Sequence, residues 1–206
     1  GWSISENFVY AMELVQVCYK RKVPTIVLKL DFAKAFDTVN WEALMDILSA
    51  RGFSQLWCRW VFDLLASSKS AVLVNGCPGP WIECKRGLRQ GDPMSPYLFL
   101  LVADVLQTLI KSDGGVRHPV LEDGTCAVLQ YADDTLVVCR GEVADVVRLR
   151  LLLDQFAEAT GLKINYSKST AVPMHVPVAT LPECIATVSC REDGFPQTYL
   201  GLPLSN

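Results

Sequence analysis

Three aspartates have the residue type and the setting for metal-assisted phosphate chemistry. Asp31 follows an apolar run at residues 25–30, and Asp133 and Asp134 lie between two further apolar runs. Clustered carboxylates repel one another and raise their own pKa values, so they need a counter-charge. Mg²⁺ supplies one while also binding substrate phosphates, and two such ions can clamp both oxygens of a phosphoryl transfer. An Asp-Asp pair between strands is also a common turn, so the residues alone leave a structural role open.

The elements that would position these aspartates follow from the spacing of apolar residues. Helical periodicity predicts helices at residues 3–20, 41–50, 54–67, 98–109 and 142–160, with Asn40 as an N-cap and Gly161 as a stop. β-rich runs predict strands at residues 25–30, 71–75, 81–85, 125–131 and 135–139, with a turn at 76–80 and a strand or strand pair within 162–172. Residues 173–198 are rich in proline and turn residues and remain unassigned.

The predicted order of elements indicates an α+β fold. Without residues 41–90 the order is strand, helix, strand, strand, helix, strand, which is the β-α-β-β-α-β arrangement of ferredoxin-like folds. That fold places the strand at 25–31 beside the hairpin at 126–139, in one antiparallel sheet backed by helices. We therefore expect Asp31, Asp133 and Asp134 to meet at one edge of the sheet.

Composition bounds the class of protein. The 206 residues suffice for one domain, and 50% hydrophobic with 20% charged residues excludes a disordered or fibrous chain. A net charge of −3 differs from the basic balance of proteins that coat nucleic acid, so any such binding needs local basic patches or further domains. The eight cysteines contain no Cys-x-x-Cys pair, which argues against a zinc site. We expect an intracellular protein, in nucleus or cytoplasm, with no membrane partner.

Five motifs occur in the order found in reverse transcriptases. They lie at residues 28–37 (motif A), 86–96 (motif B), 131–134 (motif C, Tyr-Ala-Asp-Asp), 161–165 with Lys168 and Ser169 (motif D), and 199–201 (motif E). Each motif alone is a weak signal, but five in order across nearly the whole chain are specific. The chain therefore resembles the reverse transcriptase domain of LINE-type non-LTR retrotransposons, particularly those of plants.

This resemblance implies a polymerase palm that acts as an RNA-directed DNA polymerase on an RNA template, a DNA primer and dNTP. Asp31, Asp133 and Asp134 would be catalytic and, with the Phe32 carbonyl, would bind two Mg²⁺ ions, for which Mn²⁺ could substitute. The remaining implied residues bind nucleotide (Phe36, Arg89, Gln90, Gly91 and Lys168) or begin the primer grip (Tyr199, Leu200 and Gly201).

The resemblance also implies a domain organisation. Residues 1–24 would be a remnant helix of the fingers, and residues 25–206 the palm, with a hairpin at 70–90 leaning toward the fingers and the primer grip starting at 199–206. The other fingers strands, the thumb and an endonuclease domain would belong to the rest of a polyprotein. One departure stands at the start, where Trp2 follows Gly1 and the family usually has Gly-Arg.

Simpler interpretations remain open for several of these residues. Phe36 could be a core residue, Gln90 and Gly91 could form an ordinary entry to a helix, and Lys168 could be an exposed lysine. Two alternatives for the whole chain are a reverse transcriptase of the group II intron maturase type and an inactive retroelement remnant. Flanking domains would separate the first, and the intact acids argue against the second.

Overall fold

A five-stranded sheet forms the centre of the computed structural model, which describes residues 3–206. Its strand order is β6-β7-β1-β8-β9, with β1 at Thr25–Leu30, β6 at Ala127–Tyr131, β7 at Asp134–Arg140, β8 at Thr170–Met174 and β9 at Arg191–Glu192. All neighbours are antiparallel except β8 and β9. The departure noted at residues 1 and 2, and the start of the unit expected at 1–24, lie outside the described residues.

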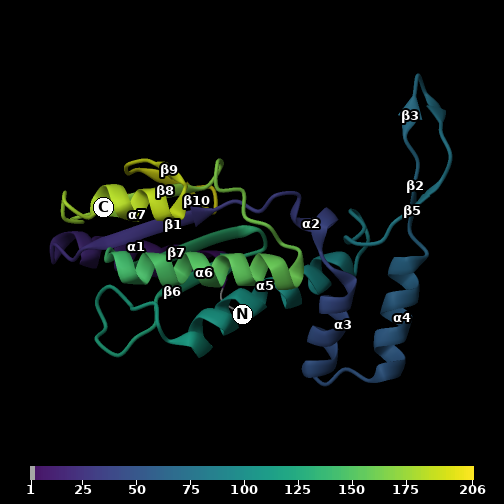
Figure 1. Ribbon diagram of the computed structural model, residues 1–206, viewed down its shortest axis with the longest axis horizontal. Coiled ribbons are helices and arrows are strands. Elements are labelled where there is room, and N and C mark those ends of the chain that lie inside the picture. The colour runs from purple at the N-terminus through teal and green to yellow at the C-terminus, as the bar shows by residue number, and fades with distance from the viewer. Residues whose placement is uncertain (1–2) are drawn as a thin grey trace.

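Helices cover both faces of this sheet (Figure 1). Helix α5 (Ser95–Asp113) connects β1 to β6 through the intervening segment, and α6 (Val143–Thr160) connects β7 to β8. Ile26 and Leu28 pack with these two helices in the larger core, whereas Val27 packs on the other face with α1 (Ile4–Lys20). The predicted α+β fold with a β-α-β-β-α-β core is therefore confirmed, with β9 added beside β8.

The segment between β1 and α5 carries further helices and a projecting arm. It contains α2 (Ala35–Thr38), α3 (Trp41–Ala50) and α4 (Gln55–Ala66), followed by β2 (Lys69–Ser70), β3 (Leu73–Val74), β4 (Cys77–Pro78) and β5 (Ile82–Glu83). Figure 1 shows the arm of β2 to β5 reaching away from the sheet. The predicted strands at 71–75 and 81–85 and the turn at 76–80 are wrong in detail. β3 pairs with β4 across the tight turn at Asn75-Gly76. Only two residues of each strand pair in the β3–β4 ladder and in the β2–β5 ladder.

Most helix boundaries agree with the predictions, and the reasons are local. The Asn40 side chain accepts hydrogen bonds from the backbone N–H groups of Glu42 and Ala43, which begins α3. Gly161 ends α6 with a φ of 81°, a conformation that favours glycine. In the predicted strand region at 162–172, Ile164 makes only an isolated bridge to Phe32, and regular pairing begins at β8.

The unassigned C-terminal segment is ordered by packing. It contains α7 (Leu181–Val188), β9 and the start of β10 (Gln197–Tyr199), and β10 pairs with β11 (Leu202–Leu204) beyond it in a hairpin. Among residues 3–206, no helix is both long enough and apolar enough to cross a membrane.

Candidate active site

Strand register brings the two halves of the acidic site together. Leu30 lies opposite Thr135 in the antiparallel pair of β1 and β7, so the next residues along, Asp31 and Asp134, meet at the same end of the sheet and on the same face. Tyr131 pairs with Asp134, which leaves Ala132 and Asp133 as a two-residue turn. The expected approach of the 31 and 133–134 segments is therefore present.

The hairpin turn has an unusual backbone for its residue types. Ala132 has a φ of 54°, in the left-handed region that costs a non-glycine residue free energy. A strained backbone conformation of this kind persists only where the surrounding structure holds it, and it is often found at functional sites. Here the paired strands β6 and β7 hold Ala132, and this fixes where the adjacent Asp133 leaves the sheet.

Charge and burial distinguish the aspartates. The side chains of Asp31 and Asp133 are exposed, whereas Asp134 is half-buried. Burial raises the pKa of Asp134, and the neighbouring charge of Asp133 raises it further, although Lys29 opposes the shift. Lys29 itself donates a hydrogen bond from Nζ to the Thr198 carbonyl at 2.7 Å, so its ammonium is already engaged.

Residues of motif D hydrogen-bond the backbone just after the end of β1. The Asp31 carbonyl accepts a hydrogen bond from the Asn165 N–H at 2.7 Å, and the Asp31 N–H donates to Ser169 Oγ at 3.0 Å. Phe32 has a buried side chain whose ring lies 6.2 Å from that of Phe156. The backbone that carries the first aspartate is therefore fixed on both sides.

The carboxylates fit a divalent cation in type but do not enclose one as they stand. Oxygen ligands suit Mg²⁺, and a half-buried carboxylate with a raised pKa beside a second carboxylate would gain from a cation. Within residues 3–206, however, no group of three or more His, Cys, Asp or Glu side chains is arranged to hold a metal ion.

Motifs A and B meet through a close backbone contact. The Leu88 N–H donates to the Phe36 carbonyl at 2.6 Å, and the Gly87 N–H donates to the Val39 carbonyl at 2.8 Å. Gly87 has a φ of +87°, and a Cβ placed there would lie 2.6 Å from the Asp37 carbonyl oxygen. Only glycine permits this approach. The contact joins the loop before α5 to the segment after β1.

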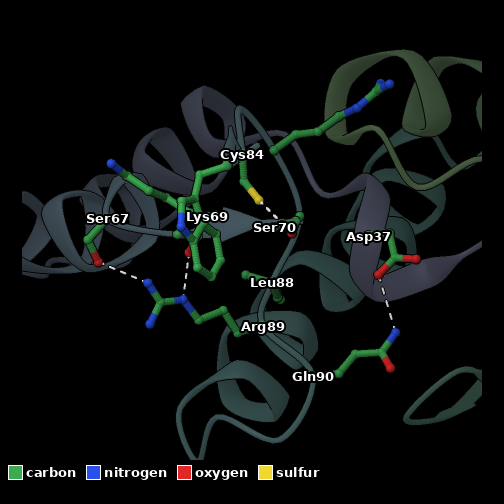
Figure 2. A pocket seen from close by; sticks show the side chains of 12 residues that line it. Asp37, Ser67, Lys69, Ser70, Cys84, Leu88, Arg89 and Gln90 are labelled. Carbon is green, nitrogen blue, oxygen red and sulfur yellow. Dashed lines mark hydrogen bonds between the residues drawn. The ribbon is translucent and has the colours of Figure 1, made fainter. Parts of the chain in front are cut away.

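A cavity of about 920 Å³ opens beside this contact (Figure 2). Residues from the end of α4, from the arm and from motif B line it: Asp37, Ser67, Ser68, Lys69, Ser70, Trp81, Cys84, Arg86, Gly87, Leu88, Arg89 and Gln90. Sequence reasoning missed Lys69 and Trp81, which lie outside the motifs. Their basic and aromatic types next to motif B were the available signal, because that combination suits bases and phosphates.

Arg89 is held by protein groups in this cavity. It donates from Nε to Ser68 Oγ at 2.6 Å, and from its terminal nitrogen to Ser67 Oγ at 2.9 Å and to the Leu64 carbonyl at 3.3 Å. These bonds satisfy polar groups at the C-terminal end of α4. Gln90, in contrast, donates to the Asp37 carboxylate at 3.2 Å (Figure 2). The nucleotide-binding role expected of both residues stays a prediction.

The other predicted nucleotide contacts lie in different settings. Phe36 is partly buried, and its ring stacks on Phe99 with centroids 4.9 Å apart and planes 15° from parallel. Lys168 is exposed, and its backbone N–H donates to the Asn165 carbonyl. Gly91 has a φ of +87° with open space at its Cβ position, in the turn before α5. The entry to α5 itself differs from an ordinary cap, because the side chain of Asp92 accepts from the Met94 N–H.

The expected primer-grip residues form a tight hairpin turn. Leu200 and Gly201 have φ values of 50° and 78° between β10 and β11. Tyr199 is fully buried, and its hydroxyl donates to the Leu129 carbonyl at 3.3 Å. This bond anchors the hairpin to β6, the strand that leads into the acidic turn.

Comparison with known proteins identifies the family. The model for "Reverse transcriptase (RNA-dependent DNA polymerase)" matches residues 3–203, so the chain belongs to the reverse transcriptase family. It is 31% identical over 185 residues to a retrovirus-related Pol polyprotein from the type-1 retrotransposable element R2 of Popillia japonica, covering 85% of this chain and 26% of the relative. It is 27% identical over 208 residues to the transposon TX1 uncharacterized 149 kDa protein of Xenopus laevis, covering 100% and 16%.

A solved structure shares the fold. Apo telomerase from Candida tropicalis superposes with a TM-score of 0.60 at 13% identity, over 85% of this chain and 36% of that one. The resemblance to the reverse transcriptase domain of non-LTR retrotransposons is thus confirmed, as is the palm fold. Enzymes of this family act on nucleic acids and use divalent metal ions. This chain spans about a quarter or less of the two curated relatives.

Proposed function

We propose that this chain is the catalytic palm of an RNA-directed DNA polymerase, with Asp31, Asp133 and Asp134 as its metal-binding acids. The observation that carries the proposal is the register of β1 against β7, which sets Asp31 beside Asp134 at the hairpin turn. Two Mg²⁺ ions, or Mn²⁺ in their place, would activate a primer 3′-hydroxyl and neutralise the charge of the leaving pyrophosphate. The carbonyl of Phe32 would complete the ligand set.

The chain's own residues would orient the substrates. Phe36 would pack under the sugar of the incoming dNTP, with Gln90 and Gly91 beside it, while Lys168 would lie toward the pyrophosphate. The primer end would rest on the turn at Tyr199, Leu200 and Gly201. The engaged ammonium of Lys29 would hold that turn and limit repulsion at Asp134, since it bonds Thr198 and lies near the carboxylate.

The cavity beside motif B would hold part of the RNA template or the nucleotide. Lys69 and Arg86 offer cations and Trp81 an exposed ring that can stack on a base. Arg89 would act indirectly by fixing the end of α4. The rest of the fingers, the thumb and an endonuclease domain would belong to a longer polyprotein, as in the domain organisation expected above, with the site of action in nucleus or cytoplasm.

Primer extension on an RNA template with Mg²⁺ tests this function. The 206-residue chain and a longer polypeptide that contains it would each be compared with Asp133→Asn. The control is Asp46→Asn, an exposed aspartate on α3. We expect Asp133→Asn to abolish extension and weaken Mn²⁺ binding measured by electron paramagnetic resonance, and Asp46→Asn to change neither. Equal extension by Asp133→Asn and the unmodified chain would remove the catalytic assignment.

A further inference from the structure

The carboxylate of Asp37 lines the cavity beside motif B, and its partner there is the carboxamide of Gln90. Gln90 Nε2 donates to Asp37 Oδ1 at 3.2 Å, and both residues are exposed. Within residues 3–206, no other side chain or backbone group donates to the Asp37 carboxylate, and none of the ion pairs includes it. This acid is therefore committed to one neutral neighbour.

A helix-capping role does not account for Asp37. The residue lies shortly before α3, but the Asn40 side chain accepts the hydrogen bonds that begin that helix. Asp37 belongs instead to the single turn α2, where its backbone N–H donates to the Lys34 carbonyl at 2.8 Å. Its side chain is left free to act on the cavity.

The two backbones are held together before these side chains meet. In addition to the bonds of Gly87 and Leu88 to residues 36–39, the Trp41 indole donates from Nε1 to the Gly87 carbonyl at 2.7 Å. Trp41 is buried, so this bond is shielded from water. Neighbouring bonds therefore set the spacing of the two segments, and the bond between the side chains acts mainly on the orientation of the carboxamide.

A carboxylate determines which end of a carboxamide faces it. It accepts hydrogen bonds and donates none, so the NH₂ group of Gln90 must face Asp37. The carbonyl oxygen Oε1 then lies on the side away from Asp37, as Figure 2 shows. In the described part of the chain no group donates to this oxygen. The cavity beside motif B thus contains an acceptor whose direction is fixed in advance.

Fixing a side chain in advance improves the affinity for a ligand. A flexible side chain that becomes ordered only on binding lowers affinity by about twofold to tenfold. Gln90 is exposed, so without Asp37 its carboxamide would turn freely in solvent. Held by Asp37, it is already ordered for a ligand that donates to Oε1.

We propose that Asp37 is a positioning residue that acts on the bound nucleotide through Gln90. By holding the NH₂ group, Asp37 presents Gln90 Oε1 to a hydrogen-bond donor of the nucleotide. The inference rests on the nucleotide-binding role proposed above for Gln90, and it adds a residue of motif A that has no contact with the nucleotide itself. The apparent affinity for dNTP should therefore depend on Asp37, whereas the rate of the chemical step should not.

Steady-state primer extension on an RNA template, with a polypeptide that contains this chain, tests the inference through KM and kcat for dNTP. Asp37→Asn keeps the size of the side chain but offers both a donor and an acceptor, so Gln90 loses its single orientation. We expect KM to rise about fivefold and kcat to change less than twofold. Asp37→Glu still only accepts and should keep KM within twofold. Asp46→Asn, exposed on α3, is the control and should change neither value.

A double-mutant cycle separates action through Gln90 from any other effect of Asp37. Gln90→Met removes both polar ends of the side chain at similar size. Adding Asp37→Asn to Gln90→Met should then change KM less than twofold, because the residue that Asp37 orients is already gone. Effects that multiply would overturn the proposal, and so would an unchanged KM in Asp37→Asn alone.

An NMR arm needs no polymerase activity. In ¹H–¹⁵N spectra of the 206-residue chain, the two side-chain amide protons of Gln90 should differ in chemical shift, and Gln90→Met assigns them. Asp37→Ala should move both toward the values of free glutamine, and unmoved signals would overturn the proposal. If no polypeptide that contains the chain extends a primer, the proposed function fails and this inference with it. Normal extension with equal KM in Asp37→Asn would remove only the role of Asp37.

Discussion

The Gln90 carboxamide donates a hydrogen bond to the Asp37 carboxylate at 3.2 Å, although 53 positions separate the two residues. This bond joins the segment after β1 to the loop before α5, next to the backbone contact of Gly87 with Asp37. The contact therefore links the end of β1 to the cavity beside motif B. Substitutions at this contact should change both the stability of the fold and the binding of any substrate in the cavity.

Gly87→Ala should destabilise the fold more than Gly91→Ala. Both glycines have a φ of +87°, so alanine at either position costs roughly 1–2 kcal/mol in the left-handed region. At Gly87 the added Cβ would also lie 2.6 Å from the Asp37 oxygen, whereas at Gly91 nothing lies within 4 Å. Urea unfolding of both variants measures the difference, and equal losses of unfolding free energy would show that the Gly87 backbone contact is not tight.

Asp134→Asn should become relatively more stable as pH rises. Burial raises the pKa of Asp134 in the folded chain above its ordinary value of 3.8, so the folded state disfavours the charged carboxylate. The wild type therefore loses stability as pH rises from about 3.8 through the raised pKa, and the asparagine variant does not. Thermal unfolding across this range should show a gap in favour of Asp134→Asn that widens with pH.

Two comparisons serve as controls for that prediction. Asp46→Asn, on the exposed surface of α3, should show no widening gap. Added Mg²⁺ should raise the melting temperature of the wild type, because a cation offsets the charge near Asp134, and should leave Asp134→Asn nearly unchanged. A stability difference between Asp134→Asn and the wild type that does not change with pH would contradict the assigned cause of the pKa shift.

Substitutions of Arg89 and Arg86 should affect stability and nucleic-acid binding separately. Arg89→Ala removes three hydrogen bonds at the end of α4 and should cost about 1–3 kcal/mol of unfolding free energy. Arg86 is exposed in the same cavity, so Arg86→Ala should alter stability by less than about 0.5 kcal/mol. If Arg86 contacts phosphate, its removal should weaken binding of a single-stranded RNA and reduce the slope of affinity against salt by about one. If Arg86→Ala lost stability and Arg89→Ala lost RNA binding, the two assigned roles would be exchanged.

The sheet that carries the acids was predictable because each strand is an apolar run of its own. Residues 25–30 and 135–139 are buried on both faces, and their order along the chain allowed few topologies. The tail was not predictable in the same way. Helix α7 has only eight residues and contains a proline, and it forms against α6 rather than from its own periodicity.

The site was predictable only as far as its motifs reach. Motif spacing gave Asp31 and the 133–134 turn, whose approach depends on strand pairing. It could not reveal that Arg89 is committed to the end of α4, because Ser67 and Ser68 come from a segment with no signal of its own. The arm of two-residue strands and its Trp81 likewise depend on contacts that no local pattern encodes.

Phe36→Val should raise ribonucleotide incorporation in any form of the chain that extends a primer. In the proposed site the Phe36 ring would lie under the sugar and leave no room for a 2′-hydroxyl, and the smaller side chain would create that room. The stack on Phe99 means the same change should also cost stability, of which about 0.5–1.5 kcal/mol comes from the aromatic pair. Phe99→Leu separates the effects, because it removes the stack and keeps the ring at position 36. Steady-state incorporation of dNTP and NTP measures discrimination, and an unchanged ratio in Phe36→Val would leave this ring a core residue only.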